Sequence, residues 1–205
     1  MSFMNRLFSR KPKDTNQAFW QWFIAHSAEL LDVTTCQEDI CGELYAQMKI
    51  VHKGLVYAFG PETDGKREFI VSADGIKTVF PAVLTLVNSA PDIPRWRIIA
   101  FRPAAGWGIK MQMGDTAIGA EDIWYMAEED DGRVNLVLFI RNSMMESDLK
   151  TAKEIAFLLL DFGLGEYIVE TKIGSIDFQP LPDDPLPSSL NPLPELSAAV
   201  NRLIR

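Results

Sequence analysis

The sequence predicts an α+β protein in which two strand-strand-helix-strand units form a largely antiparallel sheet with helices packed on it. Two observations lead to this fold. An Asp-Gly dipeptide separates two apolar runs at 64–65 and again at 131–132, which is a strong hairpin signal. Each hairpin precedes a stretch of helical periodicity and a further apolar run, and the two units close on "AFRP" at 100–103 and "DFQP" at 177–180.

These limits divide the chain into three parts. Residues 1–15 form a basic amphipathic leader, 16–180 form the α+β body, and 181–205 form a Pro-rich linker with a C-terminal helix. Within the body the pseudo-repeat units cover about 36–103 and 104–180, and descent of the two by duplication is only suggested because their residue identity is low.

The N-terminal part of the body predicts two helices. Residues 16–31 predict a helix with Trp20, Phe23, Ile24, Leu30 and Leu31 on its buried side, and Asp14, Thr15 or Asn16 is suited to cap it. A second helix is expected from about 37 to 49. Trp20 and Trp22 are two residues apart on the first helix and therefore cannot both face one core.

Each unit then follows the same order. In the first, the hairpin "GLVYAFGPETDGKREFIVSADG" leads to a helix at about 78–89 and to the strand "RWRIIAF". In the second, "DIWYMAEEDDGRVNLVLFI" leads to a helix at 147–162, with Ser147 as a cap candidate, and then to the extended segment "YIVETKIGSIDF". The C-terminal helix, 195–204, is amphipathic and must cover either its own sheet or a neighbouring subunit.

Composition bounds the function. The chain has 205 residues, 47% of them hydrophobic, which suits a packed core. Its formal charge is −8, although residues 1–13 carry four cations and no acid. The α+β body is acidic and would repel the phosphate backbone of a nucleic acid. We therefore expect no nucleic-acid partner. The start "MSFMNRLFSRKPK" lacks the features of a secretory signal, and we expect a cytoplasmic protein.

The acidic run Glu128–Asp131 is the most site-like stretch, yet it fits a turn. A calcium loop with Gly132 at its sixth position would begin at Ala127 and end at Leu138, and neither residue is a suitable ligand. Cys36 and Cys41 lack a second pair at zinc spacing; a local disulfide between them is possible, but reduced thiols are expected. We therefore expect no metal and no cofactor.

Three short stretches hold candidate binding residues. Trp107 lies between two glycines, where it either makes an exposed contact or folds back onto the sheet, and both interpretations stay open. Arg95 and Arg97 flank Trp96 as a small basic cluster, for which solvated strand ends are the simpler interpretation. Ser72 and Asp74 form an anion site if they lie at a helix N-terminus, although an Asp-Gly turn explains them more simply.

Three classes of function follow, in order of preference. The absence of a catalytic motif favours a non-enzymatic binding or regulatory protein, which acts through protein contacts or through self-association of the C-terminal helix. The second is a hydrolase that uses Asp74, Glu166 or His52 in a cleft between the two units. The third is a peripheral membrane adaptor, held weakly by the leader residues Phe3, Arg6, Leu7, Phe8 and Arg10.

The stretches "FWQWF", "FIVSADG", "WRIIAFRP" and "LGEY" resemble an uncharacterised bacterial family, a domain of unknown function, over roughly residues 17–180. That resemblance implies a bacterial cytosolic origin and no particular activity. The repeated element order also resembles ferredoxin-like regulators, such as proteins that inhibit ribonucleases by direct contact, as an analogy of architecture.

Overall fold

The computed structural model describes residues 14–33, 39–141, 148–182 and 186–204. Two compact units divide the chain, Met1–Ala100 and Phe101–Arg205, so the boundary falls just before the expected one at 103–104. Each unit combines helices with a small sheet, and most strand pairs are antiparallel, which confirms the predicted α+β class.

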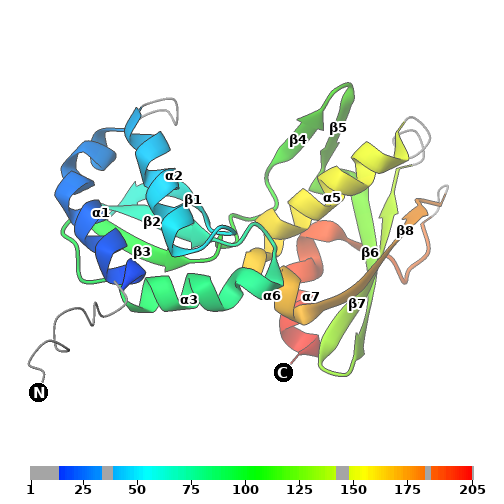
Figure 1. The fold of residues 1–205 in the computed structure, drawn as a ribbon. Helices are drawn as coiled ribbons and strands as arrows, with labels where there is room; N and C mark the ends of the chain where they lie inside the picture. The colour runs from blue at the N-terminus through cyan, green and yellow to red at the C-terminus, as the bar shows by residue number, and fades with distance from the viewer. Residues whose placement is uncertain (1–13, 34–38, 142–147, 183–185, 205) are drawn as a thin grey trace, which may run out of the picture. The chain divides into compact units, whose positions relative to one another are not determined.

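The first unit begins with two helices and then follows the predicted strand-strand-helix-strand order (Figure 1). Its elements are α1 (Thr15–Asp32), α2 (Asp39–Val51), β1 (Val56–Thr63), β2 (Lys66–Ser72), the 3-10 turn η1 (Lys77–Val79), α3 (Phe80–Asn88) and β3 (Trp96–Ala100). The sheet has the order β1-β2-β3, with β1 antiparallel and β3 parallel to β2.

The second unit places a small hairpin before the same order of elements. Its elements are β4 (Lys110–Met113), β5 (Thr116–Gly119), η2 (Ala120–Asp122), β6 (Ile123–Asp130), β7 (Arg133–Ile140), α5 (Leu149–Leu164), α6 (Glu166–Lys172), β8 (Ile173–Pro180), β9 (Asn191–Pro192), η3 (Leu193–Glu195) and α7 (Leu196–Leu203). The main sheet runs β8-β7-β6-β9, with β6 antiparallel and β8 parallel to β7. The core order of both units is thus alike, while common descent of the halves stays a prediction.

Both predicted Asp-Gly hairpins are confirmed. Asp64 and Gly65 have φ values of 54° and 73°, and Asp131 and Gly132 have 49° and 74°. Two consecutive left-handed residues make the turn whose twist matches that of paired strands, and aspartate and glycine tolerate this conformation best. The acidic run at 128–131 therefore forms the end of the β6–β7 hairpin.

Two local expectations were wrong, and one element was not foreseen. The N-cap of α5 is Asp148, whose carboxylate accepts a hydrogen bond from the Thr151 N–H at 3.1 Å, so the helix begins two residues after Ser147. Tyr167–Lys172 is helical and belongs to α6, because Gly165, with φ 86°, ends α5 and lets a new helix start at once. The β4–β5 hairpin was not foreseen, since its polar strands of four residues carry little apolar pattern.

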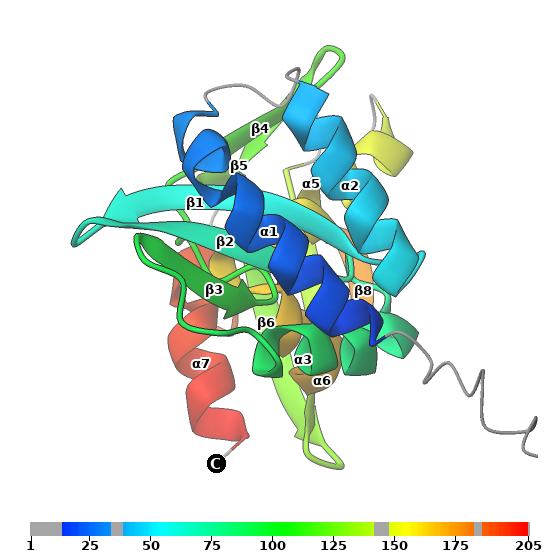
Figure 2. The ribbon, with the colours of Figure 1, turned by 60° about the vertical axis from the view of Figure 1, so that its left-hand side comes forward.

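An aromatic cluster forms the core of the first unit. Figure 2 shows α1 crossing the sheet, and Phe19, Trp20 and Phe23 on this helix are all buried, whereas Ile24, expected on the buried side, is 47% exposed. They meet Phe69 of β2 and Trp96 of β3, with the Phe23 and Phe69 ring centroids 4.7 Å apart. Trp22 is half-exposed and stacks on His26. Helix geometry explains the exposure, because residues two positions apart, such as Trp20 and Trp22, face different directions.

Arg67 on β2 holds the end of α1. Its Nη1 donates hydrogen bonds to the carbonyls of Leu30, Leu31 and Val33 at 2.9–3.0 Å. The last carbonyls of a helix have no partner within the helix, and a cation there also opposes the negative end of the helix dipole. The guanidinium lies over the Phe59 ring, 4.5 Å from its centroid.

We expect Arg67→Met to lower the free energy of unfolding by about 2–3 kcal/mol, because partly buried carbonyls would lose a charged donor. Urea denaturation followed by tryptophan fluorescence measures this. Lys66→Met is the matched control: Lys66 makes only an exposed ion pair with Asp92 at 3.7 Å, which is worth little. Equal losses in the two variants would contradict the assignment.

One face of the main sheet in the second unit is covered by helices. The inward residues of β6 and β7, among them Tyr125, Leu136 and Leu138, share one apolar cluster with α5 and α7. Leu196, Ala199 and Val200 are the buried residues of α7. The C-terminal helix therefore covers its own unit, and self-association through its remaining surface stays a prediction.

Candidate functional site

Ser72 and Asp74 do not lie at the N-terminus of α3. Ser72 is buried, and its hydroxyl accepts a hydrogen bond from the Asp74 N–H at 3.0 Å. Asp74 is exposed and, with Gly75, turns the chain in the left-handed conformation. α3 starts only at Phe80, and η1 has Ile76 at its N-cap with no side-chain cap. The interpretation as a turn, not an anion site at a helix N-terminus, is the one that matches this geometry.

Arg95, Trp96 and Arg97 point in different directions. Trp96 is only 2% exposed, and its indole N–H donates to the Ser27 carbonyl at 3.2 Å. Arg95 pairs with Glu62 at 3.9 Å, and Arg97 pairs with Glu68 at 3.4 Å. The tryptophan is thus a core residue between two exposed strand-end arginines, and the three do not form one surface.

Trp107 folds back within the second unit, where it packs against the apolar cluster and contacts α5 and α7. Its ring packs directly over Gly163 of α5, where a Cβ atom would overlap the indole. Its indole N–H donates to the Ser197 hydroxyl of α7 at 3.1 Å, and that hydroxyl donates to the Gly163 carbonyl at 3.2 Å. Part of the ring is therefore engaged within the second unit, and a role of Trp107 in binding a partner stays a prediction.

The residues considered for hydrolysis have differing environments. His52 and Asp74 are exposed residues of the first unit, and the His52 ring accepts a hydrogen bond from the Gly54 N–H at 3.0 Å. Glu166 belongs to the second unit and is fully buried, and its Oε2 accepts a hydrogen bond from the Arg102 N–H at 3.0 Å. The Glu166 N–H donates to the Arg102 carbonyl at 3.0 Å as well. This reciprocal pair fastens the segment after Phe101 to the start of α6.

The remaining expectations concern the leader, the cysteines, a metal site and a membrane-spanning helix. The leader residues Phe3, Arg6, Leu7, Phe8 and Arg10 lie outside the described residues, and so does Cys36. No group of three or more His, Cys, Asp or Glu side chains that could hold a metal ion occurs in the parts of the chain that the structure describes. Within the same parts, no helix combines the length and apolar character needed to cross a bilayer.

The most site-like surface is the second face of the main sheet in the second unit, which we call the outer face. Successive strand residues point to opposite sides, and on β7 the fully buried Val134, Leu136, Leu138 and Ile140 alternate with partly exposed residues. The alternate residues of β6, β7 and β8 define the outer face: Trp124, Met126, Glu128, Asn135, Val137, Phe139, Ser175, Asp177 and Gln179.

Strand register arranges the outer face in three rows. Trp124 lies opposite Phe139, which lies beside Gln179, and Met126 lies opposite Val137, which lies beside Asp177. Glu128 lies opposite Asn135, whose side-chain oxygen accepts a hydrogen bond from the Ser175 N–H at 2.8 Å. One end of the outer face is therefore aromatic and apolar, and the other is polar and acidic.

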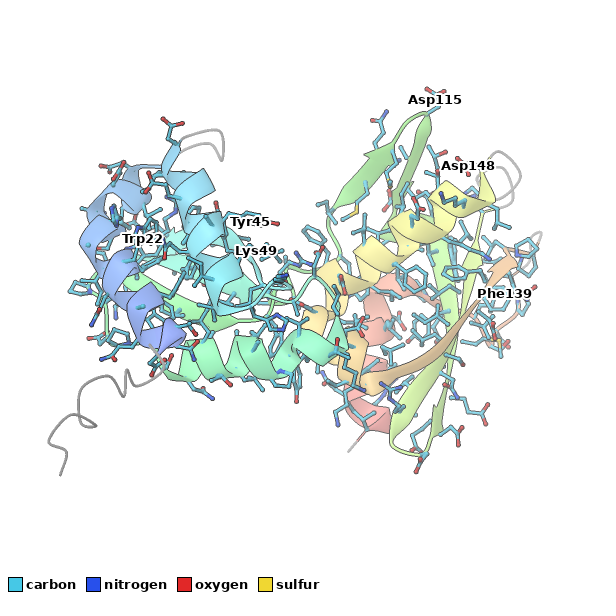
Figure 3. All side chains as sticks on the ribbon, viewed as in Figure 1. Trp22, Tyr45, Lys49, Asp115, Phe139 and Asp148 are labelled. Atoms are coloured by element: carbon cyan, nitrogen blue, oxygen red, sulfur yellow. The ribbon has the colours of Figure 1, made fainter. Side chains whose placement is uncertain are left out.

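A shallow groove of about 270 Å³ follows the middle and polar rows. It is lined by Met126, Ala127, Glu128, Asn135, Leu136, Val137, Ser175 and Asp177. Met126 is 42% exposed, whereas Trp124, Val137 and Phe139 are half-buried. Figure 3 labels Phe139 on the side of the sheet turned away from α5. A solvent-facing side of an antiparallel sheet is normally polar, so this apolar end is unusual.

The charge around the outer face is negative. Glu128 and Asp177 line the groove, and the acidic end of the β6–β7 hairpin follows Glu128 directly. Arg141, at the aromatic end, is paired with Asp122 at 3.5 Å and lies 5.9 Å from the centre of the Trp124 ring. Residues 101–205 carry nine lysines and arginines against seventeen aspartates and glutamates, while residues 1–100 carry eleven of each. The whole net charge of the chain thus belongs to the second unit.

Two other hollows have less chemical character. A cavity of about 460 Å³ beside α1 is lined by Asp14, Gln17, Trp20, Gln21, Ile24, Ser89 and Pro91. A second, of about 540 Å³, lies between Asp115 at the end of the β4–β5 hairpin and Asp148 at the start of α5, both labelled in Figure 3. Asp148 is the N-cap of α5 and accepts hydrogen bonds from the Thr151 hydroxyl and N–H. These bonds hold the pKa of the Asp148 carboxyl below its ordinary value.

Sequence reasoning missed the outer face, although a signal was present. The strand of Arg133–Ile140 has apolar residues at nearly every position, where a strand with one solvated face should alternate. Trp124 and Phe139 belong to the two strands of the predicted hairpin, and the turn signal alone does not say which side of the sheet they face. No protein-family model, curated protein or solved structure matches this chain. The resemblance of "FWQWF" and "WRIIAFRP" to a bacterial family therefore stays a prediction.

Proposed function

We propose that this protein is a non-enzymatic binding or regulatory protein, and that the outer face of the second unit is the surface that contacts its protein partner. The observation that carries the proposal is the apolar end of that face, where Trp124, Met126, Val137 and Phe139 adjoin one another across two paired strands. Tryptophan, methionine and phenylalanine are enriched at the centres of protein interfaces, where they supply most of the binding energy.

The position of these residues adds support. They lie on rigid, paired strands, so that little conformational entropy is lost when a partner covers them. The opposite face of the sheet is already covered by α5 and α7, so packing against these two helices does not account for the apolar side chains. The polar rim of Asn135, Ser175 and Asp177 supplies the hydrogen-bonding groups that interfaces place around an apolar centre.

The test is affinity capture from an extract of the source organism with the full chain as bait. We expect Phe139→Ser to reduce recovery of the captured protein about tenfold, since a central aromatic residue usually contributes more than 1 kcal/mol. Tyr45→Ser is the matched control, because Tyr45 is 46% exposed on α2 of the first unit (Figure 3). Circular dichroism must show both variants folded. Capture by neither variant nor wild type, or equal capture by all three, would contradict the proposal.

A hydrolase that uses Asp74, Glu166 or His52 and a membrane adaptor that uses residues 3–13 stay predictions from the sequence. Burial of Glu166 and exposure of the other two residues favour structural and surface roles for them. We therefore offer neither as a second function.

A further inference from the structure

We infer that the outer face of the second unit binds an amphipathic helix whose polar rim is basic. This inference rests on the proposed function and deepens it by naming the chemistry of the partner. Three properties of the outer face indicate such a partner: its apolar end is two strands wide, acidic side chains lie along its groove, and the strand register fixes the distance between its aromatic and acidic ends.

Among the described residues, the helices of the second unit pack on the inner side of the sheet. Its inner face packs against α5 and α7 through a single apolar cluster, as sheets in two-layer proteins do. The outer face presents Trp124 beside Phe139 and Met126 beside Val137, which is an apolar surface two strands wide. Paired strands lie about 4.8 Å apart, and a helix with its side chains is about 10 Å in diameter, so a single helix suits this width.

The acidic side chains of the outer face favour a positively charged partner. Glu128 and Asp177 line the groove itself, and Glu129, Asp130 and Asp131 follow at the hairpin end. The two arginines nearby are engaged: Arg141 pairs with Asp122, and Arg133 donates to the Glu170 carbonyl at 3.0 Å. With the second unit carrying the whole net charge of the chain, an acidic partner would be repelled and a basic one attracted.

The strand register fixes the distance between the aromatic and the acidic residues of the outer face, and a partner must match this distance. Trp124 and Glu128 are four residues apart on one strand, which is roughly 13 Å at 3.3 Å per residue. A helix rises about 5.4 Å per turn, so when leucine-like residues lie over Trp124 and Phe139, a lysine or arginine about one turn further along lies over Asp177 and another about two turns further along lies over Glu128. The partner should therefore be apolar at one end of its contact face and basic at the other.

The experiment measures binding of synthetic helical peptides to the full chain by isothermal titration calorimetry at low salt. The probe is a leucine–lysine peptide of about four turns, and its matched control replaces every lysine by glutamate. We expect the lysine peptide to bind in a one-to-one complex that weakens as salt is added, and the glutamate peptide to bind at least about tenfold more weakly.

Two double variants locate the charge effect. Glu128→Lys with Asp177→Lys should weaken the lysine peptide about tenfold or more. Asp115→Lys with Glu154→Lys changes the net charge equally on other exposed surfaces of the same unit and should leave binding within about twofold. Phe139→Ser should also weaken binding. Urea denaturation checks that each variant remains folded.

Several results would overturn the inference. They are no binding of the lysine peptide, equal binding of the glutamate peptide, or equal weakening by the two double variants. A dimer in sedimentation equilibrium that Phe139→Ser dissociates would show that a second copy occupies the outer face instead. If capture in the extract depends on Phe139 while the peptides show no charge preference, the proposed function stands and only this inference falls.

Discussion

Phe69→Ala should lower the free energy of unfolding by about 3–5 kcal/mol, the usual cost of removing a fully buried aromatic side chain. Phe69 is 0% exposed, and its ring centroid lies 4.7–6.4 Å from those of six other aromatic residues: Phe19, Trp20, Phe23, Tyr57, Phe59 and Trp96. Truncation would leave a cavity that the six rings, held by one helix and two strands, cannot close. Urea denaturation, followed by tryptophan fluorescence, measures the loss.

Tyr45→Ala is the control for this prediction, because Tyr45 is an aromatic residue of the same unit that is 46% exposed. It makes a cation–π contact with Lys49 at 4.4 Å from the ring centroid, so we expect its loss to cost less than about 1 kcal/mol. A small effect of Phe69→Ala, close to that of Tyr45→Ala, would show that the aromatic cluster does not hold the first unit together.

Glu166→Ala should lower the free energy of unfolding by about 2–3 kcal/mol, since it removes the side-chain acceptor of the Arg102 N–H inside the second unit. The neighbouring contacts are close: at Gly165 a Cβ atom would lie 2.9 Å from the Ala104 nitrogen. The segment that leads to Trp107 is further held by the Ala105 N–H, which donates to the Phe162 carbonyl at 2.8 Å. Loss of Glu166 should therefore loosen this whole segment, and quenching of Trp107 fluorescence by acrylamide should increase.

The conservative change separates a structural role from a catalytic one. Glu166→Gln keeps an oxygen that accepts from the Arg102 N–H, so we expect it to cost only about 1 kcal/mol. Glu154→Ala is the surface control, because Glu154 makes only an exposed ion pair with Lys150 at 3.7 Å. If Glu166→Gln left stability unchanged but abolished a measurable hydrolysis, Glu166 would be a catalytic residue and the structural assignment would be wrong.

The elements that sequence reasoning located well are those with local causes. Asp64-Gly65 and Asp131-Gly132 form their hairpins because four residues alone contain the turn chemistry. α1 and α5 follow apolar residues at helical spacing, and their real bounds lie within two residues of the expected ones. Tyr167–Lys172 was misplaced because its apolar residues suit a strand as well as a helix, and only the Gly165 turn after α5 decides between them.

The candidate site depended on information that no local pattern holds. Trp96 lies between two arginines, Trp107 between two glycines and Trp124 between two large side chains. None of these local patterns says that Trp96 lies in a core, that Trp107 packs on Gly163 or that Trp124 lies on the outer face. Which of them a partner can reach depends on what packs against each one. Those neighbours come from segments tens of residues away, such as Ser27 for Trp96 and Ser197 for Trp107.

By itself, the sequence determined the α+β class, the two hairpins and the repeated order of elements, because turn preference and apolar spacing act over a few neighbouring residues. The tertiary structure alone decided that α5 and α7 cover the same face of the β8-β7-β6-β9 sheet, that Glu166 is buried against Arg102, and that Trp124 and Phe139 are left on the outer face. The physical reason is that strand alternation defines two faces without saying which one is covered. That choice is made by the free energy of burying apolar surface between distant segments of the chain.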